Sequence, residues 1–356
     1  MTSNAGVEAR ILILGMGDLG VRIAQSVTEQ RLASVCMLAG QSGAARQWAQ
    51  LLNISSGRDV RSTLLDGQDE EALASLLSEF EPDVIVQCAT LLSPFAMADK
   101  GTPASEAVRA GGFALQASAQ LPVIRTVMKV RRKLGMQCPV VNCSYPDVTN
   151  PVLATEGLAP TAGIGNVAIM AMRFGVLLPA GKRNTLQVIG QHAQLGPSLA
   201  GRRASPEAPV PLVYADGRLL AEQELLLDTG LQAGSTLNHL AAATALPIIR
   251  AFVERDKVHD THAPGILGLP GGYPVRIAGG EVELRLPDGV TRDAAVAFNT
   301  LAAKGEGLER IADDGTILYT EAAQQAVAAW CPELAEPLRA DQALERLKVL
   351  QGVLQA

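Results

Sequence analysis

The sequence has few of the residues that build metal, disulfide and nucleic-acid sites. Its five cysteines form no C-x-x-C pair, so we expect buried, reduced thiols rather than a zinc site. Acidic residues outnumber basic ones, 36 to 30, and this balance disfavours binding to a phosphate backbone. Only His259 and His262 lie close together, flanking Asp260 in an expected polar loop where they could bind a divalent ion. We expect no metal and no nucleic-acid partner.

Segments that direct a chain to a membrane are also lacking. The N-terminus has no basic region followed by an apolar stretch, so we expect no secretion signal. The longest apolar tract, residues 163–181, contains Asn166 and Arg173 and is a poor membrane span. We therefore expect a cytoplasmic protein without a membrane partner.

The amino-acid composition is that of a globular protein. Hydrophobic residues make up 48% of the chain and charged residues 19%, a balance that excludes disorder. A length of 356 residues allows two domains of ordinary size. We predict a dinucleotide-binding domain at residues 1–150 and an α+β substrate domain at residues 151–356.

The most informative stretch is a glycine-rich turn near the N-terminus. An apolar run at residues 11–14 precedes it and an amphipathic segment follows, which predicts a strand, a tight turn and a helix. In such a unit Gly15 permits the sharp turn, Gly17 lets backbone amides approach a pyrophosphate, and Gly20 lets the helix pack closely on the strand. The pyrophosphate would lie at the amide-rich helix N-terminus. The predicted cofactor-binding residues here are Gly15, Met16, Gly17, Asp18, Leu19 and Gly20.

The end of the second predicted strand, residues 34–39, indicates which dinucleotide binds. NAD sites usually place Asp or Glu there to bind the ribose, but residues 33–45 contain no carboxylate. Ser42 offers a hydroxyl, and Arg46 in the next helix could form charge-assisted bonds to a 2′-phosphate. We predict NADP rather than NAD, with Gly40, Ser42 and Arg46 on its adenosine side. The alternative for Arg46 is an ordinary solvated helix residue.

Strands and helices continue to alternate through the first half. Further strands are predicted at residues 60–65, 83–89 and 139–143. This alternation implies an α/β fold with a doubly wound parallel sheet. Ligands of such sheets lie beyond the carboxyl ends of the strands, so Ala89 and Thr90 are predicted beside the nicotinamide. The long polar loop at residues 91–112 is broken by Pro and Gly, which is typical of a mobile lid.

The second half reads as α+β, because strands and helices no longer alternate strictly. It opens with a glycine-broken start to an apolar helix at residues 157–174. Strands are predicted at 185–189, 210–214, 274–278 and 282–286, and helices at 236–255, 292–304, 321–330 and 340–354. The apolar face of the last helix fits a homodimer contact or an intramolecular one equally well.

The order of these segments resembles the lactate/malate dehydrogenase superfamily. Arg109 precedes a helix much as the substrate-clamping arginine of that family's mobile loop does, and Asn142 and Tyr145 lie near its N-P-V-D turn. The run A-M-R-F ending at residue 174 is similar to the family's A-R-F segment, whose arginine grips the substrate carboxylate. The run V-I-G-Q-H resembles the strand with the catalytic histidine. The resemblance implies hydride transfer, with catalytic residues His192, Arg173, Tyr145, Arg109 and Asn142.

One position departs from the family pattern. The family's aspartate that orients the histidine lies three residues before the clamping arginine, where this chain has Met170. A histidine without this carboxylate loses its fixed tautomer and the stabilisation of its charged form, so another acid such as Asp147 is needed. The first half is equally similar to saccharopine and opine dehydrogenases, which reduce imines.

The named side chains also have purely structural interpretations. His192 could bind only backbone groups, Tyr145 could be an ordinary turn residue, and Arg109 a surface arginine. Arg173, inside an apolar helix, needs an anionic partner, either a substrate carboxylate or a structural acid. Asn142 could fix a substrate hydroxyl or cap a helix.

The sequence as a whole favours an NADP-dependent oxidoreductase that acts on a small anionic 2-oxo or imino acid. One alternative is a saccharopine-like imine reductase with the same cofactor. Another is a catalytically silent dinucleotide-binding sensor or scaffold, which Met170 keeps open.

Overall fold

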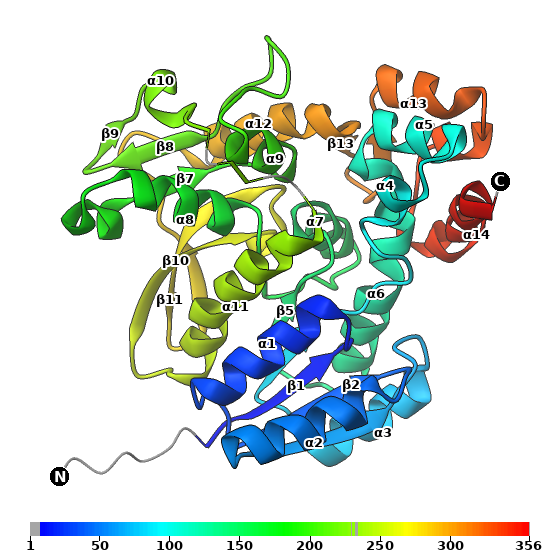
Figure 1. The fold of residues 1–356 in the computed structure, drawn as a ribbon, viewed down its shortest axis with the longest axis vertical. Helices are drawn as coiled ribbons and strands as arrows, with labels where there is room; N and C mark the ends of the chain where they lie inside the picture. Colours follow the sequence, from blue (N-terminus) through cyan, green and yellow to red (C-terminus); the bar gives the residue numbers. More distant parts are fainter. Residues whose placement is uncertain (1–7, 229, 232–233, 356) are drawn as a thin grey trace.

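The computed structural model describes residues 8–228, 230–231 and 234–355. The first half contains a six-stranded parallel sheet in the order β3-β2-β1-β4-β5-β6, which confirms the predicted doubly wound fold (Figure 1). Its strands are β1 (Arg10–Leu14), β2 (Val35–Gly40), β3 (Asp59–Leu64), β4 (Val84–Gln87), β5 (Val140–Asn142) and β6 (Ala162–Gly163). Its helices are α1 (Asp18–Glu29), α2 (Ala44–Ser56), α3 (Glu70–Phe80), α6 (Ala117–Lys133) and α7 (Pro146–Thr155).

Alternate side chains of β1 enter two separate cores. Leu12 and Leu14 pack with α3, α6 and elements from the end of the chain. Ile11 and Ile13 pack with α1, α2 and α11 (Asn238–Val253). All four are at most 2% exposed, as expected for a parallel sheet covered on both faces. The turn that follows β1 therefore has a rigid support.

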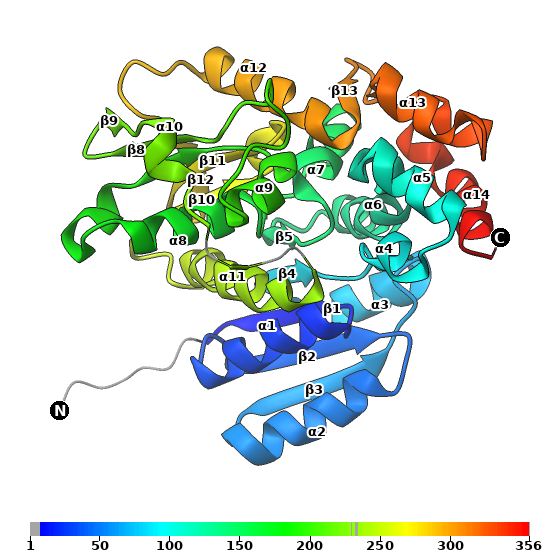
Figure 2. The same cartoon turned by 45° about the horizontal axis from the view of Figure 1, so that its top comes forward.

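The second half contains antiparallel sheets, which confirms the predicted α+β character. One sheet has β7 (Gln187–Ile189), β8 (Leu212–Ala215) and β9 (Arg218–Leu219); another has β10 (Val258–Pro264), β11 (Gly272–Ala278) and β12 (Glu281–Leu284). A hairpin joins β13 (Leu308–Ile311) and β14 (Ile317–Tyr319). The helices are α8 (Val167–Leu177), α9 (Leu195–Leu199), α10 (Glu222–Leu225), α12 (Arg292–Ala303), α13 (Glu321–Ala328) and α14 (Ala343–Gln355). Figure 2 shows α11 between the parallel sheet and β10–β12.

The sequence did not predict strands at β6, β9, β10, β13 or β14, and two of these change the expected architecture. Residues 162–163, expected at the approach to a helix, form β6 and carry the parallel sheet past residue 150. His259 and His262, expected in a polar loop, lie on β10, which pairs along its whole length with β11. Both segments are short or polar, so neighbouring strands rather than apolar periodicity determine their structure.

The prediction of a long loop at residues 91–112 was wrong, and the role of this segment as a mobile lid stays a prediction. The segment contains α4 (Ala96–Lys100) and α5 (Pro103–Gly111). Ala104, Val108 and Gly111 recur at helical spacing and are buried, and α5 packs against α13. Thr102 caps α5 by accepting a hydrogen bond from the backbone of Ser105 at 3.2 Å. The polar residues that suggested a loop are thus a helix cap and a solvent-facing surface.

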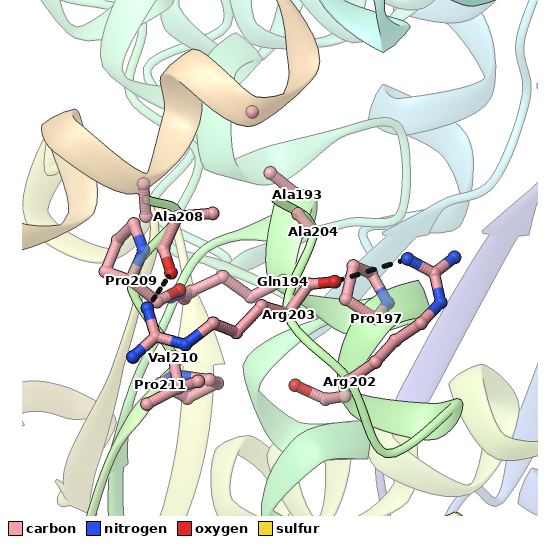
Figure 3. A pocket seen from close by; sticks show the side chains of 13 residues that line it. Ala193, Gln194, Pro197, Arg202, Arg203, Ala204, Ala208, Pro209, Val210 and Pro211 are labelled. Carbon is pink, nitrogen blue, oxygen red and sulfur yellow. Dashed lines mark hydrogen bonds between the residues drawn. The ribbon is translucent and has the colours of Figure 1, made fainter. Parts of the chain in front are cut away.

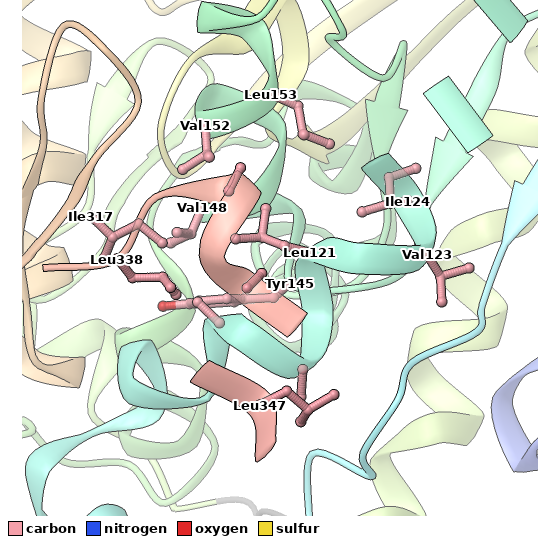
Figure 4. Packing of buried hydrophobic residues seen from close by; sticks show 14 of the residues in the cluster. Leu121, Val123, Ile124, Tyr145, Val148, Val152, Leu153, Ile317, Leu338 and Leu347 are labelled. Carbon is pink, nitrogen blue, oxygen red and sulfur yellow. The ribbon is translucent and has the colours of Figure 1, made fainter. Parts of the chain in front are cut away.

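The end of the chain packs back onto the first half. Leu347 and Leu350 of α14 are buried in the same core as α6 and α7. Figure 4 shows Leu347 in this core, together with Leu338, Ile317 and Val148. The chain therefore covers Leu347 and Leu350 of this apolar face, whereas Leu344 is 48% exposed.

One segment, Ser235–Val253, is long and apolar enough to cross a membrane by length and composition alone. It includes α11, whose Ile248, Ile249 and Phe252 are buried in the core shared with β1 and α1. A core helix of a globular protein passes the same test, so this segment is weak evidence for a membrane span.

Candidate active site

The glycine-rich turn has one closed side and one open side. Gly15 adopts a φ of 100°, and a Cβ there would lie 2.4 Å from the backbone nitrogen of Ala89. A Cβ at Gly20 would lie 1.9 Å from the carbonyl oxygen of Gly15, so α1 can pack this closely only because residue 20 is glycine. A Cβ at Gly17 would meet nothing within 4 Å. The turn therefore leaves space at Gly17 and none on its inner side.

The N-terminus of α1 begins beside this space. Gly17 is its N-cap residue, and no side chain caps the helix. Asp18 in the first turn is bound by Arg22 at 3.0 Å and by Asn238 Nδ2 at 2.9 Å. The hydrogen bond from Arg22 is the main cause that lowers the pKa of Asp18. Since Asn238 begins α11, the second half of the chain reaches the turn.

The residues at the end of β2 surround the expected adenosine side. Gly40 faces Met16, whose backbone nitrogen would lie 3.6 Å from a Cβ on the glycine. Ser42 Oγ accepts a hydrogen bond from the backbone of Ala44 at 3.3 Å. Arg46 is exposed in the first turn of α2, and its guanidinium has no hydrogen bond or ion pair within the described residues. This arginine is available to bind an anion.

Ala89 and Thr90 follow the carboxyl end of β4, and both are half-buried. The carbonyl oxygen of Ala89 accepts hydrogen bonds from Gln87 Nε2 at 2.6 Å and Ser144 Oγ at 3.1 Å. These bonds tie the ends of β4 and β5 together next to Gly15, because Ala89 also lies against that glycine.

His192 lies directly after β7, at the start of a 3-10 turn (His192–Gln194). Gln191 caps this turn, and its Oε1 accepts a hydrogen bond from the backbone of Ala193 at 2.6 Å. The backbone N–H of His192 donates to Asp147 Oδ1 at 3.1 Å. The imidazole Nδ1 lies 2.5 Å from Glu306 Oε2, and the side chain is 29% exposed. Among the described residues, Nε2 has no hydrogen-bond partner.

Glu306 is a buried carboxylate that binds three side chains. Its Oε1 accepts hydrogen bonds from the Tyr145 hydroxyl at 2.5 Å and from Gln191 Nε2, while Oε2 binds His192. The side chain is 4% exposed. A Cβ on Gly112 would lie 2.2 Å from the carbonyl carbon of Glu306, so the two backbones are in direct contact. This contact fixes the backbone of Glu306, and its three side-chain partners hold the carboxylate.

Two further rings enclose the imidazole. The ring centroid of Phe113 lies 5.0 Å from that of His192 and 4.7 Å from that of Tyr145. The Tyr145 and His192 centroids are 5.2 Å apart. Tyr145 caps α7 in a left-handed conformation with φ of 50°, and Figure 4 shows its ring within the apolar core beside Val148 and Leu338. The rings hold the imidazole against Glu306.

The charges in this cluster favour a protonated histidine. Burial opposes the charge of His192, but the Glu306 carboxylate outweighs it and raises the pKa of His192 above its usual 6.5. Burial, and then the charge of Glu306, raise the pKa of Tyr145 well above 10, so this hydroxyl stays neutral and donates. Burial also raises the pKa of Asp147 to about 6. The imidazolium can therefore persist near neutral pH.

Asp147 connects His192 to α8 instead of supplying the carboxylate to the imidazole. Its Oδ1 accepts from the His192 backbone, and its Oδ2 accepts from Asn166 Nδ2. Asn166 caps α8 with φ of 43° and ψ of −103°, a conformation that side-chain-bearing residues rarely adopt. Such strain persists where surrounding contacts enforce it, often at functional sites. Glu306 therefore supplies the carboxylate to the imidazole ring that the acid missing at Met170 would supply. Asp147, which we expected in this role, binds the backbone of His192 instead.

Two predicted catalytic residues have partners outside this cluster. Asn142 is fully buried, and its Nδ2 donates to Thr149 Oγ1 at 2.9 Å and Asn150 Oδ1 at 2.7 Å. Arg109 is exposed on α5 and forms an ion pair with Glu106. In this arrangement Asn142 organises the turn after β5 and Arg109 lies at the surface. A contact of either residue with a substrate stays a prediction.

Arg173 lies on α8 and is 5% exposed. Its Nη2 donates to the carbonyl oxygen of Leu227, whereas Nε and Nη1 are buried without a hydrogen-bond partner. Burial lowers its pKa, opposed by the nearby charge of Asp228. The cavity that Arg173 lines includes neither His192 nor Glu306. The predicted pairing of Arg173 with a substrate at His192 therefore has no support from contacts.

A small pocket lies beside the segment that follows His192 (Figure 3). Its volume of about 10 Å³ is no more than one water molecule requires. Gln194 Nε2 donates to the carbonyl oxygen of Pro209 at 2.8 Å, and Arg203 Nη1 donates to that of Ala208 at 2.8 Å. These bonds hold the segment in place, and the pocket is too small for an organic ligand.

No group of three or more His, Cys, Asp or Glu side chains within the described residues could hold a metal ion. His262 Nε2 accepts a hydrogen bond from the backbone of Val188 at 3.0 Å. His259 Nε2 lies 3.7 Å from Glu254 Oε2. The two histidines predicted as a pair thus have separate neighbours.

Solved structures share this fold at low sequence identity. The malate dehydrogenase of Picrophilus torridus matches with a TM-score of 0.51 and 13% identity, over 95% of this chain and 99% of that chain. A minor L-lactate dehydrogenase from Enterococcus mundtii matches with a TM-score of 0.50 and 13% identity, over 83% of this chain and 96% of that chain. No protein-family model and no curated protein matches the sequence. The chain therefore has the fold of these dehydrogenases.

Proposed function

We propose that this protein is an NADP-dependent oxidoreductase that transfers a hydride between nicotinamide and a small anionic 2-oxo or imino acid. The observation that carries the proposal is the pairing of an open dinucleotide turn with a histidine held in its charged form by Glu306. The structural neighbours are named as malate and L-lactate dehydrogenases, and malate and lactate are both 2-hydroxy acids. Their names support the substrate class.

The turn at residues 15–20 fits a dinucleotide. The space at Gly17 and the uncapped N-terminus of α1 suit a pyrophosphate, because free backbone amides there can donate to phosphate oxygens. Arg46 has no partner in the part of the chain that the structure describes, and residues 33–45 hold no carboxylate, which supports a 2′-phosphate and hence NADP. Ala89 and Thr90 would lie beside the nicotinamide, which supplies or accepts the hydride when bound.

His192 would act as the proton donor. In the proposed reaction Glu306 accepts a hydrogen bond from Nδ1–H, which leaves the proton on Nε2 free to be transferred. As the substrate carbonyl or imine is reduced, Nε2–H donates to its heteroatom, and in the reverse direction neutral Nε2 accepts the proton. Tyr145 and Gln191 hold Glu306 in place by donating to its other oxygen. This role makes Tyr145 a positioning residue in the proposed reaction.

The test is NADPH oxidation in the presence of a panel of 2-oxo acids, each with and without an amine. We expect turnover with at least one member, and about a 100-fold or greater loss of kcat in His192→Asn. A requirement for the amine would identify an imine reductase. A protein that binds NADPH but never oxidises it across the panel would be a sensor or scaffold and would refute the proposed activity.

A further inference from the structure

Two cysteine side chains are in contact directly beyond the ends of β4 and β5. Cys88 Sγ donates a hydrogen bond to Cys143 Sγ at 3.4 Å, and both thiols are free and half-buried. The register that pairs Gln87 with Asn142 places the two cysteines side by side one residue further on. Neighbouring strands lie about 4.8 Å apart, which is within the Cα separation of about 4.4–6.8 Å that disulfides span. The two thiols are therefore close enough to bond without refolding of the sheet.

Cys88 also forms part of the support beneath the nucleotide turn. Its backbone N–H donates to the carbonyl oxygen of Leu14, the last residue of β1, at 2.7 Å. A Cβ on Gly15 would lie 2.8 Å from the carbonyl carbon of Cys88, and a Cβ on Gly20 would lie 3.6 Å from its Cβ. Because close-packed groups cannot shift independently, a movement of Cys88 is transmitted to the turn.

The two thiols have different tasks in an oxidation. Burial, and then contact with Cys88, raise the pKa of Cys143 well above its usual range, so this thiol stays protonated and is a poor first nucleophile. Cys88 is then the residue that reacts first with an oxidant. Cys143 is held against the oxidised sulfur, and this proximity favours the second step.

We propose that Cys88 and Cys143 form a reversible disulfide that weakens nucleotide binding at the turn, an inference that rests on the proposed function. The oxidant is a hydroperoxide such as hydrogen peroxide. The sulfur of Cys88 attacks one peroxide oxygen, the O–O bond breaks, and a sulfenic acid and a water form. The sulfur of Cys143 then attacks the sulfenic sulfur, so that the S–S bond forms, the S–O bond breaks and a second water leaves. Two thiols are oxidised, and one hydrogen peroxide is reduced to two waters.

Closure of this disulfide strains the base of the turn. The sulfur atoms must move about 1.3 Å closer to reach the length of an S–S bond. The strand spacing is near the lower end of the disulfide range, so rotation of the side chains alone leaves little freedom for this movement. A shift of Cys88 displaces Gly15 and the amides that would bind the pyrophosphate. We expect the Kd for NADPH to rise about fivefold or more in the oxidised protein.

Treatment of the full chain with hydrogen peroxide, followed by tryptic mapping without reduction, tests for the bond. Cys88 lies on the tryptic peptide of residues 62–100, and Cys143 lies on that of residues 134–173. We expect the two peptides to be joined with the loss of two hydrogen atoms, and to be separated by dithiothreitol. Cys138 shares the second peptide, so Cys138→Ser is the matched control and should keep the link.

Two variants test the order of the steps and the effect on binding. Cys143→Ala should accumulate a sulfenic acid at Cys88, which dimedone traps, whereas Cys88→Ala should give no dimedone product at Cys143. In fluorescence titrations, peroxide should raise the Kd for NADPH about fivefold in the wild type and in Cys138→Ser, and dithiothreitol should reverse the rise. The Kd of Cys88→Ala should be the same before and after peroxide.

Hydrogen exchange gives a readout that needs neither a variant nor a nucleotide. The amides of Gly15 and Val21 donate to the carbonyl oxygens of Ala39 at 2.8 Å and Gly17 at 3.0 Å, and both should exchange faster in the oxidised protein. A chain that binds no NADPH would refute the proposed function, while faster exchange would still support a disulfide that displaces the turn. The proposal is overturned if the two peptides are not joined in the wild type. A link that leaves both the exchange and the Kd unchanged, or an equal rise of Kd in Cys88→Ala, would also overturn it.

Discussion

Replacement of Glu306 by Gln should shift the pH dependence of reduction to lower pH. Glu306 binds the imidazole of His192, and a hydrogen bond to a charged group is worth about 1.5–3 kcal/mol. One pKa unit corresponds to about 1.4 kcal/mol, so we expect the pKa of His192 to fall by about one to two units. Burial then favours the neutral imidazole, and of the charges that raised its pKa only that of Asp147 remains.

The sign of the effect follows from the proton donor's role. Reduction needs the protonated imidazole, so kcat/KM declines as pH rises through the pKa of His192. In Glu306→Gln this decline should begin about one to two pH units lower, and the oxidation reaction should gain activity at those pH values. Kinetic profiles in both directions, with an NMR titration of the His192 ring to separate it from Asp147, provide the measurement.

Tyr145→Phe is the matched control for this prediction. It removes one donor to Glu306 but keeps the carboxylate charge beside His192, so the decline should move by less than about half a pH unit. An unchanged profile in Glu306→Gln would refute the assignment of Glu306 as the partner that charges His192. A loss of turnover in Tyr145→Phe as large as that in His192→Asn would instead make Tyr145 the proton donor.

Three further predictions test the nucleotide turn, the cofactor choice and the buried acid. Gly17→Ala should weaken NADPH binding about tenfold or more with little change in Tm, because its Cβ meets only protein-free space. Gly352→Ala on α14 is equally open and should bind NADPH normally; equal affinities of the two variants by fluorescence titration would contradict the pyrophosphate site. Arg46→Ala should raise the Kd for NADPH about tenfold and leave that for NADH unchanged, and an unchanged ratio would argue for NAD. Folding raises the pKa of Asp147 from 3.8 to about 6, so the folded protein keeps a proton on this carboxyl that the unfolded chain releases above pH 3.8. The stability that this proton gives is complete below pH 3.8 and is lost as pH rises through about 6. Relative to Asp147→Asn, the wild type should lose about 3 kcal/mol of unfolding free energy across that window, measured by urea denaturation, and a flat difference would contradict the shift.

The sheet and its turn could be predicted because their causes are local. The alternation of apolar strands with amphipathic helices predicts a parallel, doubly wound sheet, and the glycines of the turn make contacts within a few residues or with the end of β4. The segment at residues 91–112 was misjudged, because its Pro and Gly mark the ends of two short helices and its few apolar side chains reach the distant α13. The pairing of β10 with β11 is also a tertiary effect, since its polar sequence lacks a strand pattern.

The site could be predicted only in part. His192 was found from the residues around it, but Glu306 lies 114 residues further along the chain in a stretch without a motif. Its importance comes from contact with Gly112 and from hydrogen bonds to Tyr145 and Gln191, which no sequence spacing reveals. The absence of an acid at Met170 was the one feature of the sequence indicating that another carboxylate binds the imidazole.

The distance along the chain between His192 and Glu306 has a consequence for biosynthesis. The parallel sheet and its turn are complete in sequence once Gly163 has been added. The histidine emerges soon afterwards, yet its counter-charge is not made until the ribosome has added another 114 residues. A nascent or prematurely terminated chain can thus carry the nucleotide turn while its histidine titrates as an ordinary imidazole, so reactivity would be acquired last.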